Sequence, residues 1–460
     1  MKHHNPFGMR LNRRGFLRAS GLGAGALMLS NGLTPRLAHA QTASDHRFVF
    51  AYFSGGWDTL LCLDPRDPTT FTEEAARDTK IQLAWDRLDG GFSRDLMTFS
   101  DSPITFGPAI GDFYRHRQKA CVVRGLSMDT VTHEVGRRYM ITGKMPAGLQ
   151  ATGSAIPTRI VAQNASAEGY AIPNLASQVE TYNKGLPTIA TGMSVNGASD
   201  LVFALQKSDD APKSSIQNHL SAYRAKAVNC DPTRLDRRGF MGLLRESQSR
   251  AADLVENELH SFFDFSNPQN PDMAILRERY GIGGPRPGGL GQAVTAGEQA
   301  ALAAQALKND ISQCVSITLA SGLDTHDENW ATDHPATLEA GFNALSALID
   351  DLEEANLMSK TTIVCFSEFG RTSLLNTRDG RDHSLASCAL LVGAGVPGNT
   401  VVGATTDVGM NAMPINPDTG EAIASGGTTL TPTKLLASVM QANGYTPSEL
   451  REQGLPCLMA

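Results

Sequence analysis

The sequence predicts an α/β domain built around a mostly parallel β-sheet. Two observations support this fold class. Short, β-rich apolar runs without strict alternation recur along the chain, and such runs are typical of strands buried on both faces. Helical patterns separate these runs, and strands that alternate with helices form layered α/β sheets. The chain has 460 residues, of which 41% are apolar, so it is long enough to bury one large core.

The expected elements follow in chain order. Four runs are typical of buried parallel strands and a fifth apolar run comes after them: 47–53, 120–126, 314–320, 361–367 and 388–395. Helical patterns lie at 108–118, 296–309, 336–356 and 432–442. Within a domain of residues 41–460, residues 205–295 interrupt this alternation with polar helical sequence and a Gly-rich loop, which predicts a helical insertion or cap.

Residues 1–40 have the features of a twin-arginine export signal. Arg13 and Arg14 precede Gly-Phe-Leu and an apolar, Gly/Ala-rich run that is too short to span a membrane. Small residues at Ala38 and Ala40 predict cleavage after Ala40. The expected partners are therefore the twin-arginine translocase and signal peptidase, and the expected location is the periplasm or the medium. No later apolar run is long enough to form a stable membrane span.

Charge and cysteine content exclude several classes of protein. Loss of the signal removes six basic residues and no acidic one, which changes the net charge from -7 to -13 and argues against nucleic acid or an anionic membrane as partner. Seven widely spaced cysteines without a CxxC motif do not form a disulfide framework. The chain also lacks a haem motif, an iron–sulfur cysteine cluster and a dinucleotide fingerprint, so nothing supports a redox protein. Four cysteines in apolar runs are expected to be buried thiols: Cys121, Cys314, Cys365 and Cys388.

Polar residues that directly follow strands are the candidates for a site, because the crevice of a parallel sheet lies beyond the carboxyl ends of its strands. Asp58 follows the first strand in a Gly-Gly turn, where it is either a turn residue or a functional one. Asp324 and His326 follow the strand 314–320. Two positions apart on an extended segment, they can face the same way and hold one divalent cation, or the segment can instead cap a helix.

The segment after the strand 361–367 carries a denser set of functional groups. Glu368 and Arg371 leave the strand, and Arg381 and His383 end the following loop. A carboxylate, two guanidiniums and an imidazole together suit a metal and an anionic group. The alternative is a structural Arg–Glu ion pair that fixes the loop.

A further pair lies after the strand 120–126. Thr132 and His133 are expected near the start of a short helix, where free backbone N–H groups favour an oxyanion. Thr132 is then a candidate nucleophile and His133 a candidate metal ligand. Alternatively, Thr132 only caps the helix.

Several motifs resemble those of a known family. "SEFGRT", "GRDH" and "THEVGRRYMITGKMP" are similar to motifs of an uncharacterised family of bacterial proteins exported by the twin-arginine pathway, and the resemblance covers nearly the whole chain. That family is itself similar to the alkaline phosphatase and sulfatase superfamily. The resemblance implies a three-layer sandwich with a mostly parallel sheet, and one or two divalent metal ions such as zinc, manganese or calcium.

The resemblance also implies which residues bind metal. Phe369 stands where the superfamily has a metal-binding histidine, and His133 is our hypothesis for its replacement. The implied metal ligands are Asp58, Asp324, His326, Glu368 and His383.

The implied function is an exported, metal-dependent hydrolase of phosphate or sulfate esters. In this scheme Thr132 or a water is the nucleophile, while Arg371 or Arg381 steadies the oxygens of an anionic small-molecule substrate. The alternative is a non-catalytic exported module, for binding or assembly, that keeps the fold.

Overall fold

A computed structural model describes residues 44–206, 219, 254–255, 257–283 and 294–460. The predicted export signal and much of the predicted insertion lie outside the described residues. The chain forms two compact units, and the described residues of 44–197 and 268–460 make up the larger one, which holds the sheet. None of the described helices has the length and apolar character needed to cross a membrane.

The main sheet has eight strands in the order β12-β4-β11-β8-β1-β7-β5-β6. All of them run in one direction except β11, which is antiparallel to both of its neighbours. The strands are β1 (Arg47–Phe53), β4 (Ala120–Ser127), β5 (Asn174–Ser177), β6 (Met193–Val195), β7 (Cys314–Ala320), β8 (Thr361–Phe366), β11 (Ala386–Gly393) and β12 (Thr400–Val402). The predicted fold class, α/β with a mostly parallel sheet, is therefore confirmed.

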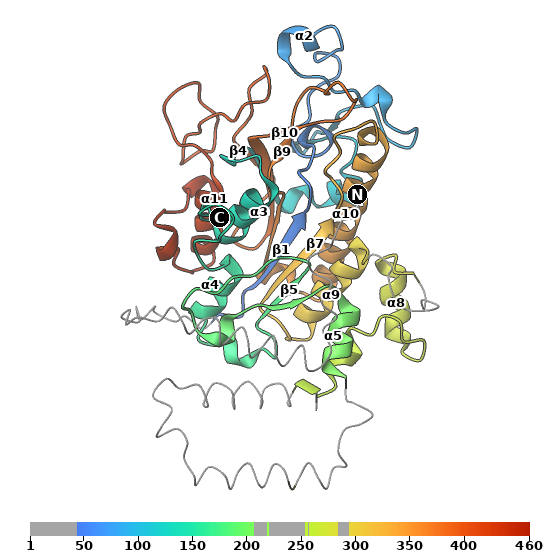
Figure 1. The fold of residues 1–460 in the computed structure, drawn as a ribbon, viewed down its shortest axis with the longest axis vertical. Coiled ribbons are helices and arrows are strands. Elements are labelled where there is room, and N and C mark those ends of the chain that lie inside the picture. The colour runs from blue at the N-terminus through green and yellow to red at the C-terminus, as the bar shows by residue number, and fades with distance from the viewer. Residues whose placement is uncertain (1–43, 207–218, 220–253, 256, 284–293) are drawn as a thin grey trace. The chain divides into compact units, whose positions relative to one another are not determined.

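Helices cover both faces of this sheet, as Figure 1 shows. On one face Phe48, Phe50 and Tyr52 of β1 belong to a core cluster that includes residues of three helices. On the other face Phe53 packs against Phe342, with ring centroids 4.8 Å apart. The helices of the first face are α3 (His133–Thr142), α4 (Ile156–Gln163) and α11 (Pro432–Ala442), and those of the second are α9 (Ala296–Lys308) and α10 (Trp330–Glu354).

The remaining elements are short. Their helices are α2 (Ala76–Thr79), α5 (Ala198–Leu205) and α8 (Pro271–Arg279). Their strands pair as β2 (Met97–Phe99) with β3 (Ser102–Phe106), and as β9 (Gly370–Arg371) with β10 (His383–Ser384). The 3-10 turns include η4 (Gly111–Lys119), where the sequence predicted a helix, and η9 (Leu259–Phe262).

Two sequence predictions about the interior can be compared with this fold. The four cysteines expected in strands are free and buried. The helix expected at 336–356 begins earlier, at Trp330, and continues through Pro335 to Glu354.

Candidate metal centre

The loops after β1, β7 and β8 meet at one edge of the sheet because two glycines allow close contact. Gly55 and Gly56 have φ values of +118° and +85°, which side chains rarely adopt. A Cβ atom on Gly55 would lie 2.6 Å from the backbone nitrogen of Asp324. The backbone N–H of Gly55 also donates to Glu368 Oε1 at 2.9 Å. The turn after β1 therefore joins the two loops that carry the candidate site residues.

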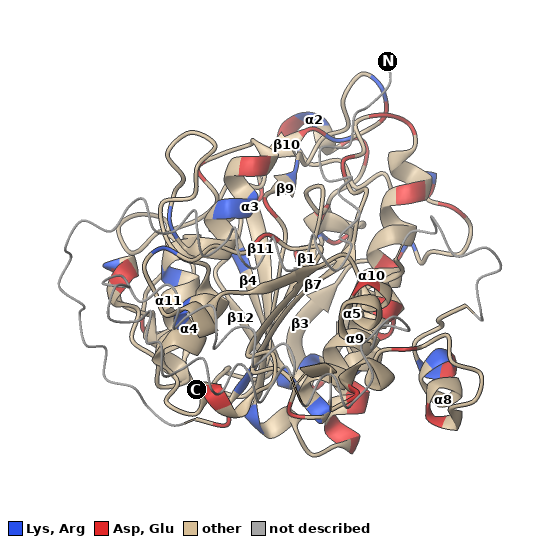
Figure 2. Cartoon of the chain, turned by 60° about the horizontal axis from the view of Figure 1, so that its bottom comes forward, with Lys and Arg blue, Asp and Glu red and all other residues tan. Residues whose placement is uncertain are grey.

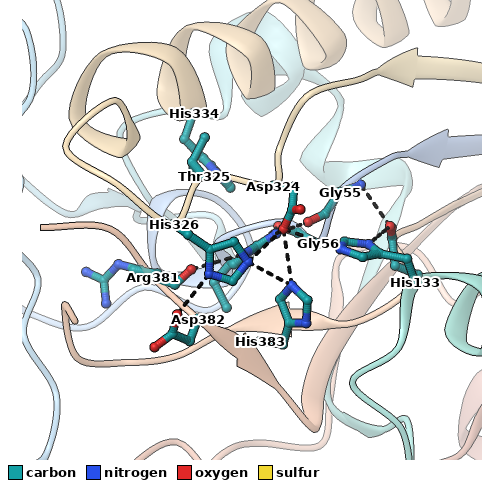
Figure 3. A network of polar contacts seen from close by, with 12 residues as sticks. Gly55, Gly56, His133, Asp324, Thr325, His326, His334, Arg381, Asp382 and His383 are labelled. Carbon is teal, nitrogen blue, oxygen red and sulfur yellow. Dashed lines mark hydrogen bonds and ion pairs between the residues drawn. The ribbon is translucent and has the colours of Figure 1, made fainter. Parts of the chain in front are cut away.

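Asp324 lies at the centre of a group of three imidazoles, which Figure 3 shows turned toward it. Its Oδ1 atom is 2.9 Å from His326 Nε2, 3.1 Å from His383 Nε2 and 3.3 Å from His133 Nε2. The Nε2 atoms of His326 and His383 are 3.0 Å apart. We call these four residues the Asp324 cluster. The structure thus brings together four of the residues that the sequence singled out.

Each imidazole of the cluster is held through its other ring nitrogen. Nδ1 contacts Glu368 Oε1 in His133, Asp382 Oδ1 in His326 and the backbone oxygen of Val131 in His383, each at 2.8 Å. When Nδ1 donates its proton to such an acceptor, Nε2 carries the lone pair. All three lone pairs then face Asp324, which is the arrangement of histidines that bind a metal ion.

The charge state of the cluster follows from its surroundings. Burial raises the pKa of Asp324, but the nearby guanidinium of Arg371 and imidazole of His383 outweigh this effect and hold the pKa well below its usual value. Burial lowers the pKa of His133, but the hydrogen bond and charge of Glu368 and the charge of Asp324 raise it by a larger amount. The pKa of His133 therefore lies above the ordinary value of 6.5. Burial keeps the pKa of His383 below its ordinary value. The cluster therefore contains an ionised carboxylate beside a readily neutral imidazole.

The donor atoms fit one divalent cation. Ligands about 2.0–2.1 Å from a tetrahedral zinc ion lie roughly 3.3 Å from one another. The donor atoms of His133, Asp324 and His383 all lie within 4.8 Å of each other, and His326 contacts two of these residues. Two lone pairs facing at 3.0 Å repel unless a proton or a cation lies between them. The Asp324 side chain is 47% exposed, so one side of the cluster remains open.

Arg371 supports this cluster from within the protein. Its side chain is fully buried, and Nη2 contacts Asp324 Oδ1 at 2.5 Å. Nε donates to the backbone oxygen of Gly56 at 3.0 Å, Nη1 donates to that of Arg381 at 2.9 Å, and Nη2 also contacts the oxygen of Gly55. Each of these donors of Arg371, expected from the sequence to grip a substrate, therefore contacts Asp324 or a backbone oxygen in this structure.

Asp58 and Arg381 form a separate, buried ion pair. Arg381 Nε lies 2.7 Å from Asp58 Oδ2, and both side chains are essentially inaccessible. The indole of Trp330 donates to the same oxygen at 2.9 Å, and the N–H of Leu60 donates to Oδ1 at 3.0 Å. The other N–H groups of Arg381 donate to backbone oxygens of Thr372, Gln82 and Leu83. This corrects two expectations: protein donors occupy both oxygens of Asp58, and Arg381 cannot reach an anion.

The remaining candidates border the cluster. Glu368, expected from the sequence to be a metal ligand, is 1% exposed and contacts His133 through the nitrogen that faces away from Asp324. The Phe369 ring packs 4.8 Å from the ring of His133 and 4.3 Å from that of His383. Thr132 is exposed and is the N-cap of α3, but its side chain makes no capping hydrogen bond, so its hydroxyl remains available. Sequence reasoning did not assign roles to Asp382 and Val131, whose contacts with histidines depend on the folded loops.

Comparison with known proteins identifies the family of this chain. A family described as "Protein of unknown function (DUF1501)" matches residues 42–423. No protein of curated function matches the sequence.

The solved structures that match are distant. The PsFucS1 sulfatase from Pseudoalteromonas sp. has a TM-score of 0.38 and 9% identity, covering 98% of this chain and 76% of that one. A protein in the alkaline phosphatase superfamily from Vibrio parahaemolyticus has a TM-score of 0.36 and 8% identity, covering 98% and 80%. The alkaline phosphatase from the Antarctic bacterium TAB5 has a TM-score of 0.28 and 10% identity, covering 78% and 94%. These values describe a remote similarity of fold and say nothing of activity.

Proposed function

The chain belongs to the DUF1501 family, which is described as being of unknown function, and we propose that it is a metal-dependent hydrolase. The proposal is drawn from the geometry of the Asp324 cluster. The observation that carries the proposal is the ring of three Nε2 atoms around Asp324 Oδ1, each at 2.9–3.3 Å. Imidazole nitrogens with one carboxylate favour zinc over calcium, which prefers six to eight oxygen ligands. The open side of Asp324 favours a reactive site over a sealed structural one.

The residues of the chain have distinct tasks in this scheme. A bound divalent cation supplies Lewis acidity and lowers the pKa of a coordinated water. Arg371 fixes the carboxylate of Asp324, while Glu368 orients His133 so that its Nε2 faces the cluster. Thr132 precedes His133 and has an unbonded hydroxyl, so it is the protein group that we propose as a nucleophile in competition with water. Phosphate and sulfate esters are the proposed substrates because the family that the sequence motifs resemble is itself similar to the superfamily that cleaves them.

The test is metal analysis followed by an ester screen. Protein loaded with zinc and freed of excess metal is expected to retain one ion per chain, and to hydrolyse at least one of the 4-nitrophenyl esters of sulfate, phosphate or methyl phosphate. His133→Ala should lower both metal retention and turnover, while Glu134→Ala on the exposed side of the same helix turn should change neither. A wild-type protein that retains no metal contradicts the proposal. Retained metal without turnover of any ester supports the non-catalytic module instead.

We also propose that the protein is exported in folded form and cleaved after Ala40. The support is the sequence of residues 1–40 with Arg13 and Arg14, all outside the described residues. The mass of protein recovered from the periplasm should match a chain that begins at Gln41. Replacing both arginines with lysine should leave the precursor in the cytoplasm. Periplasmic protein with an intact N-terminus would contradict the cleavage site.

A further inference from the structure

An anionic substrate needs a cationic partner beside the Asp324 cluster, and Arg371 and Arg381 have no donors left for it. The helix α3 offers another. Arg137 lies four positions after His133, so the two side chains lie on the same face of α3, one turn apart. Figure 2 marks this part of α3 as basic. Arg137 can bind an anion only through donors of its guanidinium that the protein does not already use.

Arg137 is only partly satisfied by the protein. Nη2 donates to Glu180 Oε1 at 2.7 Å, its one hydrogen bond among the described residues. Nε is buried and has no hydrogen-bond partner. The side chain is 24% exposed, so solutes can approach it while its stem stays fixed. Arg138 shares the same carboxylate, with Nε 3.2 Å from Oε2, so a single acid faces two guanidiniums.

Arg137 also lies close to groups that support the metal centre. Burial lowers the pKa of Arg137, but the neighbouring Tyr52, Glu180 and Glu368 raise it by more. Glu368 is the carboxylate that holds His133. Buried polar groups are almost always paired, so the unpaired Nε of Arg137 marks a place where an oxygen atom of a ligand or of water binds.

We propose that Arg137 binds the oxyanion of the substrate, a sulfate or phosphate group whose ester bond lies at the Asp324 cluster. The proposal rests on the hydrolase function proposed above and names the residue that recognises the anion. A guanidinium presents its N–H groups in a planar fork that matches two oxygens of such a group. Arg378 is 61% exposed and pairs with the similarly exposed Asp327, which directly follows His326 in the chain, so it is a suitable control.

The test measures binding of inorganic sulfate and inorganic phosphate by calorimetry, with zinc-loaded and chelator-treated protein. Arg137→Ala is expected to weaken the binding of sulfate or phosphate by about tenfold or more, because it removes one charge-assisted contact with the anion. Arg378→Ala should leave the affinity within about twofold. Arg137→Lys keeps the charge but not the fork, and an intermediate loss is expected. The fold should persist because Arg138 still neutralises Glu180, and zinc content and thermal melting verify this.

The outcomes separate the subsite from the metal centre. Equal affinities of wild type and Arg137→Ala in both preparations overturn the subsite, and so does the absence of anion binding by wild type. A wild type that retains no zinc but binds sulfate through Arg137 supports the subsite and contradicts the metal centre. Stronger binding of sulfate than of phosphate, lost in Arg137→Ala, would support the subsite and assign it to sulfate esters; the reverse order would assign it to phosphate esters.

Discussion

Replacing Asp324 with alanine is expected to lower zinc affinity by more than about a hundredfold, and to abolish ester hydrolysis. Changes to residues that only orient ligands cost roughly 10- to 100-fold, and Asp324 contacts all three imidazoles directly. Removal of its charge also leaves the buried guanidinium of Arg371 without its carboxylate partner. The measurement is competition for zinc against a chromophoric chelator, together with the metal content of the purified variant.

The matched control is Asp327→Ala, three positions further along the same loop. Asp327 is exposed and its carboxylate pairs with Arg378, not with the histidines. This variant should bind zinc like the wild type. If Asp324→Ala also retained zinc with unchanged affinity, the Asp324 cluster would not be the metal centre.

Replacing Arg381 with methionine is expected to lower the free energy of unfolding by about 3–5 kcal/mol, because it leaves a buried, unpaired carboxylate. Asp58 and Arg381 are both buried, and the same oxygen of Asp58 also accepts from Trp330. Methionine keeps much of the apolar stem of arginine, whereas it removes the guanidinium, whose carbon lies 4.7 Å from the centroid of the Trp330 ring in the wild type. Urea unfolding followed by tryptophan fluorescence measures the loss.

A double variant distinguishes a broken ion pair from simple loss of packing. Asp58→Asn combined with Arg381→Met removes both charges, so it should recover part of the stability lost by the single change. Zinc affinity of the folded double variant should stay close to that of wild type, since neither side chain belongs to the Asp324 cluster. A loss below about 1 kcal/mol for Arg381→Met, the range of exposed pairs, would contradict the role given to this pair.

The long strands of the fold were predictable because each is an apolar run with few polar interruptions. Their predicted bounds lie within two residues of those observed for β1, β4, β7, β8 and β11. The strands β5, β6 and β12 have only three or four residues, too few to show a pattern. The antiparallel direction of β11 could not be predicted from the sequence either, because a strand buried on both faces is an apolar run whether it is parallel or antiparallel to its neighbours.

The site was predictable only in part, for a similar reason. Asp324, His326, His383 and His133 could be found because polar residues that follow strands gather at one edge of a sheet. Asp58 met the same criterion, yet Trp330 and Arg381 enclose it. Residue type and position after a strand do not show which carboxylate the folded loops will bury, so the sequence could not separate a ligand from a partner in an ion pair.

The residues of the Asp324 cluster come from loops that approach one another only after the sheet has formed. His133 and its partner Glu368 are 235 positions apart, whereas only Asp324 and His326 are close along the chain. The unfolded chain therefore offers zinc a weak, two-residue site, and a cation that binds the native state alone stabilises it by mass action. The supply of zinc would then set how long the protein survives proteases, as well as whether it can carry out its chemistry.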